Sequence, residues 1–248
     1  MEIFDWKKES FIDYPGKIST IIFTAGCNYN CGYCHNPELK NLGGHIPEEK
    51  IFNYLDSRKG WINAVVISGG EPTIQFSIQE FIRKIKIRGL AVKLDTNGNY
   101  SSILDKFLEE NVIDYVAMDV KGPISLYPKI IGRDFIDERD NIGKGLVAVS
   151  KFPDYEFRTT IIPIYDNEKI RWMTPREIGQ TAKLISNWTE GAENIKYFLQ
   201  PFRAIEKKEG DNKFMKKNLP KEFWITPKDL LEEGKKEAQK FLPNTKIR

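Results

Sequence analysis

The feature that most constrains the fold is a repeated alternation of short apolar segments with longer amphipathic ones. The short segments are rich in β-branched residues, which favour strands, and the longer ones have the period of a helix. An alternation that repeats about six times favours parallel strands joined by helical crossovers. The expected strands are Ser19–Thr24, Ala64–Ser68, Ala91–Asp95, Tyr115–Asp119, Glu156–Ile162 and Ile195–Gln200. The expected helices cover Pro47–Arg58, Ser77–Arg88, Ser101–Glu110, Ile142–Phe152 and Pro175–Trp188.

Polar and glycine-rich residues follow nearly every expected strand at its C-terminal end. They occur at Ser68–Pro72, Asp95–Gly98, Met118–Lys121, Arg158–Thr160 and Leu199–Arg203. Each fragment alone is also typical of a simple turn or helix cap. Parallel strands would bring the fragments to one rim, which is where a (β/α) barrel builds its active site. The pattern therefore favours a barrel or part-barrel over a doubly wound sheet.

The loop after the first expected strand contains the only cysteines of the chain, Cys27, Cys31 and Cys34. Three thiolates with this spacing can bind three irons of a 4Fe–4S cluster, which normally takes four. The sequence offers no fourth cysteine, so one iron would stay open for something that is not protein. This arrangement indicates iron–sulfur redox chemistry on a bound small molecule.

Other uses of the cysteines explain the pattern less well. Structural zinc takes four Cys or His ligands, so a histidine would have to be the fourth. His35 directly follows Cys34, and adjacent residues reach the same ion only awkwardly. His45 lies in a Gly-Gly turn with no second ligand beside it in the sequence. Disulfides are disfavoured by the odd count and by the charged N-terminus, which does not resemble a secretory signal. A closed electron-transfer cluster would need another ligand.

Length and composition set broader limits. A chain of 248 residues favours a single domain with a sizeable core. Its composition, 40% hydrophobic and 29% charged, is typical of a soluble globular protein. A net charge of +3 gives no case for nucleic acid as a partner. No apolar run approaches the ~20 residues of a membrane span, and the cysteine usage suits a reducing cytoplasm.

These motifs together resemble the radical S-adenosylmethionine superfamily. The cysteine spacing, followed after the next expected strand by Gly-Gly-Glu-Pro, is a specific pair. Within the superfamily the sequence resembles activating enzymes of glycyl-radical enzymes, and most of all those of anaerobic ribonucleoside-triphosphate reductase. The resemblance covers about residues 10–203. It rests on Ile12–Lys17, Gly26–Asn28, Tyr33–Leu39, Ser68–Thr73, Lys93–Gly98, Tyr115–Lys121 and Arg158–Thr160.

The resemblance implies an α/β fold, a partial (β/α)₆ TIM-like barrel with a short C-terminal helical extension. We expect residues 1–203 to form this core domain and residues 204–248 to form the extension of linker and helix. The implied reaction reductively cleaves S-adenosylmethionine at a 4Fe–4S cluster. The resulting 5′-deoxyadenosyl radical removes a hydrogen atom from a glycine of a partner protein. The cluster and the cofactor are expected to carry the chemistry, and no side chain is expected to be catalytic.

The resemblance also implies partners. The expected protein substrate is a glycyl-radical enzyme, with anaerobic ribonucleotide reductase favoured, and the expected electron donor is a flavodoxin or ferredoxin. Alternatives are an activating enzyme of the pyruvate formate-lyase type and a small-molecule tailoring enzyme similar to 7-carboxy-7-deazaguanine synthase. A non-catalytic electron carrier would leave Gly69–Pro72 unexplained.

Site residues follow from the resemblance position by position. Cys27, Cys31 and Cys34 would bind the cluster, and Tyr33 would lie near the adenine. Gly69 and Gly70 would allow close backbone approach, and Glu71 would accept from the methionine ammonium. Asp95 and Asp119 would take ribose hydroxyls, or would bind a monovalent cation near Thr96. Lys121 and Arg158 would supply positive charge. The expected cofactor-binding set is Tyr33, Gly69, Gly70, Glu71, Asp95, Thr96, Asn97, Asp119, Lys121 and Arg158.

The C-terminal part departs from the pattern or lies outside it. Arg203 stands where some relatives have a histidine, which leaves the adenine and ribose contacts there open. The Lys-rich stretch Lys207–Lys221 is interpreted as an exposed linker, either plain solvated surface or a docking site for a partner. A helix is expected near Pro227–Phe241, with Thr226 as N-cap and Asp229 completing an imperfect capping box.

Overall fold

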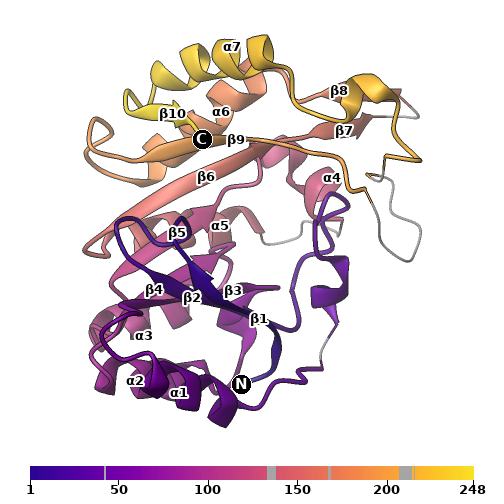
Figure 1. The fold of residues 1–248 in the computed structure, drawn as a ribbon. Helices are drawn as coiled ribbons and strands as arrows, with labels where there is room; N and C mark the ends of the chain where they lie inside the picture. The colour runs from indigo at the N-terminus through magenta and orange to yellow at the C-terminus, as the bar shows by residue number, and fades with distance from the viewer. Residues whose placement is uncertain (42, 133–137, 167–168, 207–213, 215) are drawn as a thin grey trace. The chain divides into compact units, whose positions relative to one another are not determined.

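The computed structural model describes residues 1–41, 43–132, 138–166, 169–206, 214 and 216–248. They form two compact units, each of which is built from several segments of the chain (Figure 1). The first unit contains Met1–Asn28, Asn36–Met118 and Lys151–Tyr155. The second contains Tyr29–His35, Asp119–Ser150 and Glu156–Arg248.

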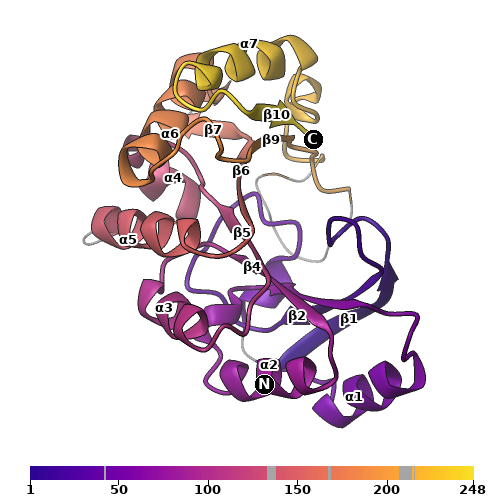
Figure 2. The same ribbon diagram turned by 90° about the vertical axis from the view of Figure 1, so that its left-hand side faces the viewer.

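The first unit is a sheet of largely parallel strands with helices between them. The strand order is β1 to β5, with β1 antiparallel to β2 and the remaining pairs parallel. Figures 1 and 2 show α1, α2 and α3 on the same side of these strands. The strands are β1 (Ile3–Ser10), β2 (Ser19–Thr24), β3 (Ala64–Gly69), β4 (Ala91–Thr96) and β5 (Tyr115–Asp119), of which the first unit includes Tyr115–Met118. The helices are α1 (Glu48–Ser57), α2 (Ile78–Ile87) and α3 (Ser101–Glu109), with 3₁₀ turns at Pro37–Lys40 and Pro72–Ile74.

The burial pattern explains why these segments form these elements. Ala64–Ile67 in β3 are all buried, because helices and neighbouring strands exclude water from both faces of a central parallel strand. In α2 the buried residues are Ile78, Phe81, Ile82 and Ile85, which recur at helical spacing on one face.

The second unit contains the remaining parallel strands and a separate hairpin. Here β9 lies between β6 and β10, and all three are parallel. Helices α6 and α7 pack on each other beside β10, where Gly234 of α7 leaves room for Ile178 of α6 (Figure 1). The strands are β6 (Tyr155–Ile161, its first residue in the first unit), β9 (Tyr197–Pro201), β10 (Thr245–Ile247) and the antiparallel pair β7 (Pro163–Asp166) and β8 (Lys169–Trp172). The helices are α4 (Tyr127–Ile131), α5 (Glu138–Ser150), α6 (Pro175–Trp188) and α7 (Lys228–Gln239), with 3₁₀ turns at Ile124–Leu126 and Lys221–Phe223.

The predicted α/β class with parallel strands and helical crossovers is confirmed. All six expected strands and all five expected core helices are present, with ends that differ by a few residues. Strand β1, the β7–β8 hairpin and strand β10 were not predicted. The division at residues 203 and 204 stays a prediction.

Two expectations for the C-terminal part are wrong. The N-cap of α7 is Pro227, without a side-chain cap. Thr226 is buried instead, where its hydroxyl accepts from Phe202 N at 2.7 Å and donates to Ile161 O at 2.8 Å. The segment after β9 is also more than an exposed linker, because Ala204, Ile205 and Leu219 are buried. Lys207, Lys208 and Lys213 of the Lys-rich stretch lie outside the described residues.

In the part of the chain that the structure describes, every helix is too short or too polar to span a membrane.

Candidate cofactor site

The predicted site residues belong to two groups, one in each unit. The first unit contains Cys27, Gly69, Gly70, Glu71, Asp95, Thr96 and Asn97. The second contains Cys31, Tyr33, Cys34, Asp119, Lys121 and Arg158.

In the first unit, the ends of β2 and β3 come into close backbone contact. Gly70 N donates to Thr24 O at 2.9 Å, and Glu71 N donates to Gly26 O at 2.8 Å. A Cβ on Gly70 would lie 1.9 Å from Gly26 O, and Gly69 has a φ of +117°. Glycine is therefore required at both positions, in one case by the close approach and in the other by the backbone angle. The expected approach of these glycines to a ligand stays a prediction.

Glu71 is a buried carboxylate surrounded by donors from its own unit. Its Oε1 accepts from Thr73 N at 3.1 Å and Thr96 Oγ1 at 2.7 Å, and also from the Thr73 hydroxyl. Its Oε2 accepts from Asn97 N at 2.7 Å. Burial raises the pKa of Glu71, and these donors only partly oppose the increase. Glu71 thus joins the loops that follow β3 and β4, while its contact with a ligand ammonium stays a prediction.

Two asparagines outside the predicted site set, Asn28 and Asn99, connect the cysteine loop to the loop after β4. Asn97 Nδ2 donates to Asn28 Oδ1 at 2.7 Å, and Asn28 Nδ2 donates to Asn99 Oδ1 at 3.1 Å. Asn28 directly follows Cys27 in the chain. The network from Glu71 through Asn97 therefore reaches the residue next to a predicted cluster ligand. Asn28 lies in the Gly26–Asn28 segment that carries the resemblance, but the segment does not indicate this contact. Asn99 has no signal of its own, because asparagine is common in ordinary turns.

Asp95 has a cationic partner that was not predicted. Lys93 Nζ lies 2.7 Å from Asp95 Oδ1, and only 4% of the Lys93 side chain is exposed. The two residues are two positions apart on β4, so their side chains point to the same face of the strand. This pairing already gives the Asp95 carboxylate a positive neighbour within the first unit.

In the second unit, the two residues predicted to supply positive charge both contact Asp119. Arg158 Nε donates to Asp119 Oδ1 at 2.8 Å, and Lys121 Nζ donates to Oδ2 at 3.2 Å. Burial raises the pKa of Asp119, but Arg158 and Lys121 outweigh it and lower that pKa to about 2. The three groups are therefore all charged near neutral pH and carry one net positive charge.

The cysteine loop is fixed in the second unit by α4 and by a turn. Asn30 N donates to Ile131 O at 2.8 Å, and Cys34 N donates to Cys31 O at 3.3 Å. A Cβ on Gly132 would lie 2.4 Å from Asn30 O, so this contact with the loop depends on glycine. Backbone contacts with α4 and within the loop thus hold Tyr29–His35.

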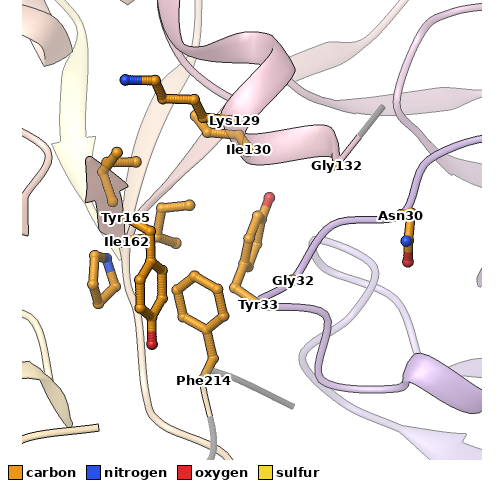
Figure 3. A pocket seen from close by; sticks show the side chains of 11 residues that line it. Asn30, Gly32, Tyr33, Lys129, Ile130, Gly132, Ile162, Tyr165 and Phe214 are labelled. Carbon is orange, nitrogen blue, oxygen red and sulfur yellow. The ribbon is translucent and has the colours of Figure 1, made fainter. Parts of the chain in front are cut away.

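A cavity of about 290 Å³ lies beside Tyr33 in the second unit (Figure 3). The ring centroid of Phe214 lies 6.3 Å from that of Tyr33 and 5.4 Å from that of Tyr165. Lys121 Nζ lies 5.9 Å from the centroid of the Tyr33 ring, whose pKa burial raises well above its usual range. Lys129 points away from these rings and pairs with Asp166 at 2.6 Å. Tyr33, Tyr165 and Phe214 thus contribute aromatic rings to the lining of this cavity, which suits a flat ligand ring.

The donor set fits an iron–sulfur cluster. None of the three cysteines forms a disulfide. Among the described residues, no three His, Cys, Asp or Glu side chains converge on a point where they could hold one metal ion. Convergence is not needed for a 4Fe–4S cluster, because each thiolate binds a different iron. Three thiols in one anchored loop match that requirement.

Residues 21–149 match the family model of the radical SAM superfamily. The chain belongs to this superfamily. It is 36% identical over 247 residues to a protein of Methanocaldococcus jannaschii, covering 96% of this chain and 92% of that one. That protein is named "Putative glycyl-radical enzyme activating enzyme MJ1227". It is 29% identical over 226 residues to the pyruvate formate-lyase-activating enzyme of Clostridium pasteurianum, covering 84% of this chain and 83% of that enzyme.

Solved structures agree with this membership at the level of the fold. Streptococcus suis SuiB bound to S-adenosylmethionine superposes with a TM-score of 0.57 at 15% identity, over 90% of this chain and 48% of SuiB. As a member of the radical SAM superfamily, the protein is an enzyme whose family implies a 4Fe–4S cluster and S-adenosylmethionine.

Proposed function

We propose that this radical SAM enzyme generates a glycyl radical on anaerobic ribonucleoside-triphosphate reductase. The observation that supports the activating role best is the similarity along 96% of the chain to a relative named for that role. The cysteine count agrees with it, since three cysteines serve one cluster and leave none for a second. The choice of reductase rests on the phrases at Ile12–Lys17, Tyr33–Leu39 and Tyr115–Lys121, which resemble activators of that enzyme.

In this proposal, Cys27, Cys31 and Cys34 bind the cluster as thiolates. When bound, the cluster supplies the electron that reductively cleaves S-adenosylmethionine. Tyr33 and the cavity beside it receive the adenine and keep water from its faces. Lys121 and Arg158 attract the methionine carboxylate, because their group with Asp119 carries one net positive charge.

The remaining contacts of the proposal involve acidic side chains and backbone groups. Glu71 accepts a hydrogen bond from the methionine ammonium. The backbone of Gly69, Gly70 and Asn97 lies close to the ligand. Asp95 and Asp119 bind ribose hydroxyls or, with Thr96, a monovalent cation. A flavodoxin or ferredoxin delivers the electron in the cytoplasm.

The test is an anaerobic reconstitution of the cluster, followed by reduction and addition of S-adenosylmethionine and the host's anaerobic ribonucleotide reductase. Electron paramagnetic resonance should then show a glycyl-radical doublet on the reductase. The doublet should be absent when any one component is left out. Parallel samples with flavodoxin or ferredoxin as the reductant identify the electron donor.

Two outcomes would contradict the proposal at different levels. Formation of 5′-deoxyadenosine without a doublet would remove the reductase as partner. A pyruvate formate-lyase-type enzyme and a small-molecule substrate, as for 7-carboxy-7-deazaguanine synthase, would then be tested in its place. Failure of the reduced holoprotein to bind S-adenosylmethionine would reject the cofactor assignment itself and favour an electron carrier.

A further inference from the structure

Lys93 is a buried lysine in the middle of β4, among apolar residues of the first unit. Its side chain is 4% exposed. In the sheet it lies beside Val66 of β3 and Tyr115 of β5, which both belong to a cluster of buried apolar residues. Its Nζ lies 5.9 Å from the centroid of the Tyr115 ring. Lysine is almost never fully buried unless it is paired, so the ammonium at this position calls for a partner.

The partner of Lys93 is Asp95, a residue of the candidate site. Lys93 Nζ donates to Asp95 Oδ1 at 2.7 Å. Among the described residues, no other acidic side chain pairs with Lys93. The Asp95 side chain is 18% exposed, so the carboxylate is the more accessible end of the pair. Lys93 is thus placed to act through Asp95 rather than on a ligand directly.

The contacts of Asp95 and Thr96 do not fit a monovalent cation held by both side chains. The two residues are adjacent on β4, so their side chains point to opposite faces of the strand. The Thr96 hydroxyl donates to Glu71 Oε1 at 2.7 Å and accepts from Gly98 N at 3.0 Å. Asp95 already has the Lys93 ammonium beside it, and a second cation there would be repelled. The first unit therefore does not bring these two side-chain oxygens together on one ion.

Asp119, the other carboxylate predicted for that cation, also has cationic partners within its own unit. Arg158 Nε lies 2.8 Å from Asp119 Oδ1, and Lys121 Nζ lies 3.2 Å from Oδ2. Each of the two aspartates is therefore next to a positive charge of the chain itself. In the proposed function the ligand carries a carboxylate, which an aspartate without such a neighbour would repel. The protein cations reduce this repulsion without an added ion.

We infer that Lys93 is a positioning residue whose ammonium takes the place of a monovalent cation beside Asp95, so that S-adenosylmethionine binding requires neither Na⁺ nor K⁺. This inference rests on the proposed function, in which Asp95 meets the ligand. It selects the ribose hydroxyls, rather than a cation, as the ligand groups that Asp95 binds. Lys93 does not touch the ligand, and its effect is to offset the charge of Asp95 and to orient the carboxylate.

The experiment measures the dissociation constant of S-adenosylmethionine for the reconstituted holoprotein by anaerobic equilibrium dialysis. The buffers contain tetramethylammonium, sodium or potassium chloride at equal ionic strength, so that screening is the same in all three. The wild type should bind with constants that agree within about threefold. Lys93→Met keeps a similar volume without the charge and should bind about tenfold more weakly in tetramethylammonium. Potassium, which is close in size to an ammonium group, should restore its binding to within about threefold of wild type.

Lys86→Met is the matched control. Lys86 also belongs to the first unit, and its Nζ lies 2.8 Å from Asp114 Oδ2. Asp114 is outside the candidate site, so this variant should bind S-adenosylmethionine equally well in all three salts. A gain with potassium in Lys93→Met but not in Lys86→Met would show that the effect belongs to the position of Lys93.

The outcomes separate the inference from the function on which it rests. Absence of binding by the wild type in every salt would reject the proposed function, and the inference with it. Wild-type binding only in sodium or potassium would leave the proposed function intact and overturn the inference alone. Equal weakening of Lys93→Met in every salt would also overturn it, because a purely structural role predicts no rescue by potassium. Should Lys93→Met fail to fold, the wild type decides: equal binding in the three salts supports the inference, and a requirement for either cation overturns it.

Discussion

Replacement of Glu71 by alanine should strongly destabilise the apoprotein, before any ligand is bound. The Glu71 carboxylate is the acceptor for two buried backbone N–H groups, those of Thr73 and Asn97. Each buried donor left without an acceptor costs roughly 1–3 kcal/mol, so two of them predict about 2–6 kcal/mol. Removal of a buried charge offsets part of this cost, and we expect a net loss of about 3 kcal/mol. For a chain of this size that loss lowers Tm by roughly 6–12 °C.

The assay is urea unfolding together with calorimetry of the cluster-free protein. Glu71→Gln should lose less than Glu71→Ala, because its carbonyl oxygen can still accept while its amide meets the Asn97 N–H as a second donor. Glu80→Ala is the matched control, since Glu80 is 67% exposed and pairs only with Lys84 among the contacts shown for it. Its unfolding free energy should change by less than about 0.5 kcal/mol. A loss below about 1 kcal/mol in Glu71→Ala would refute the view that this carboxylate is a structural acceptor.

Three further predictions follow from the site. Gly70→Ala should lower the unfolding free energy by about 3 kcal/mol, because its Cβ meets Gly26 O, whereas Gly89→Ala, with a positive φ and open space around it, should lose about 1 kcal/mol in the same urea titration. The pKa of Asp119 is lowered from its ordinary 3.8 to about 2, so its ionised form contributes stability above pH 4 that is lost as pH falls toward 2. Asp119→Asn should flatten that part of the Tm–pH curve, and an unchanged slope would argue against the charge pairing. Cys31→Ser should abolish incorporation of a stable 4Fe–4S cluster, and iron analysis with visible absorption that matched the wild type would remove this residue from the ligand set.

The elements of the fold were predictable because their signals are local. Buried parallel strands such as Ala64–Gly69 are continuous apolar runs, and helices such as Ile78–Ile87 place apolar residues on one face at a period that can be counted. The elements that were missed lack these signals. Strand β1 mixes Asp5, Lys7 and Lys8 with apolar residues because it lies at the end of the strand order, and β10 has only three residues.

The capping prediction for α7 shows how tertiary contacts override a local pattern. Thr226 and Asp229 have the spacing of an imperfect capping box. The Thr226 hydroxyl instead bonds to Phe202 N and Ile161 O, which lie far away in the sequence. These buried backbone groups need a partner, and their demand outweighs the benefit of a cap at an exposed helix start.

The sequence by itself determined the chemistry that the protein can support. The chain has three cysteines within eight residues and a Gly-Gly-Glu-Pro segment after a strand. The covalent structure fixes these residue types and their spacing, and packing cannot change them. The tertiary structure decided which charges meet. Lys93 pairs with Asp95, Arg158 and Lys121 pair with Asp119, and Arg248 reaches Glu156 across 92 positions of the chain. Such pairs form because strand register and burial bring particular side chains together, and register is set by the packing of whole strands rather than by any short run of residues.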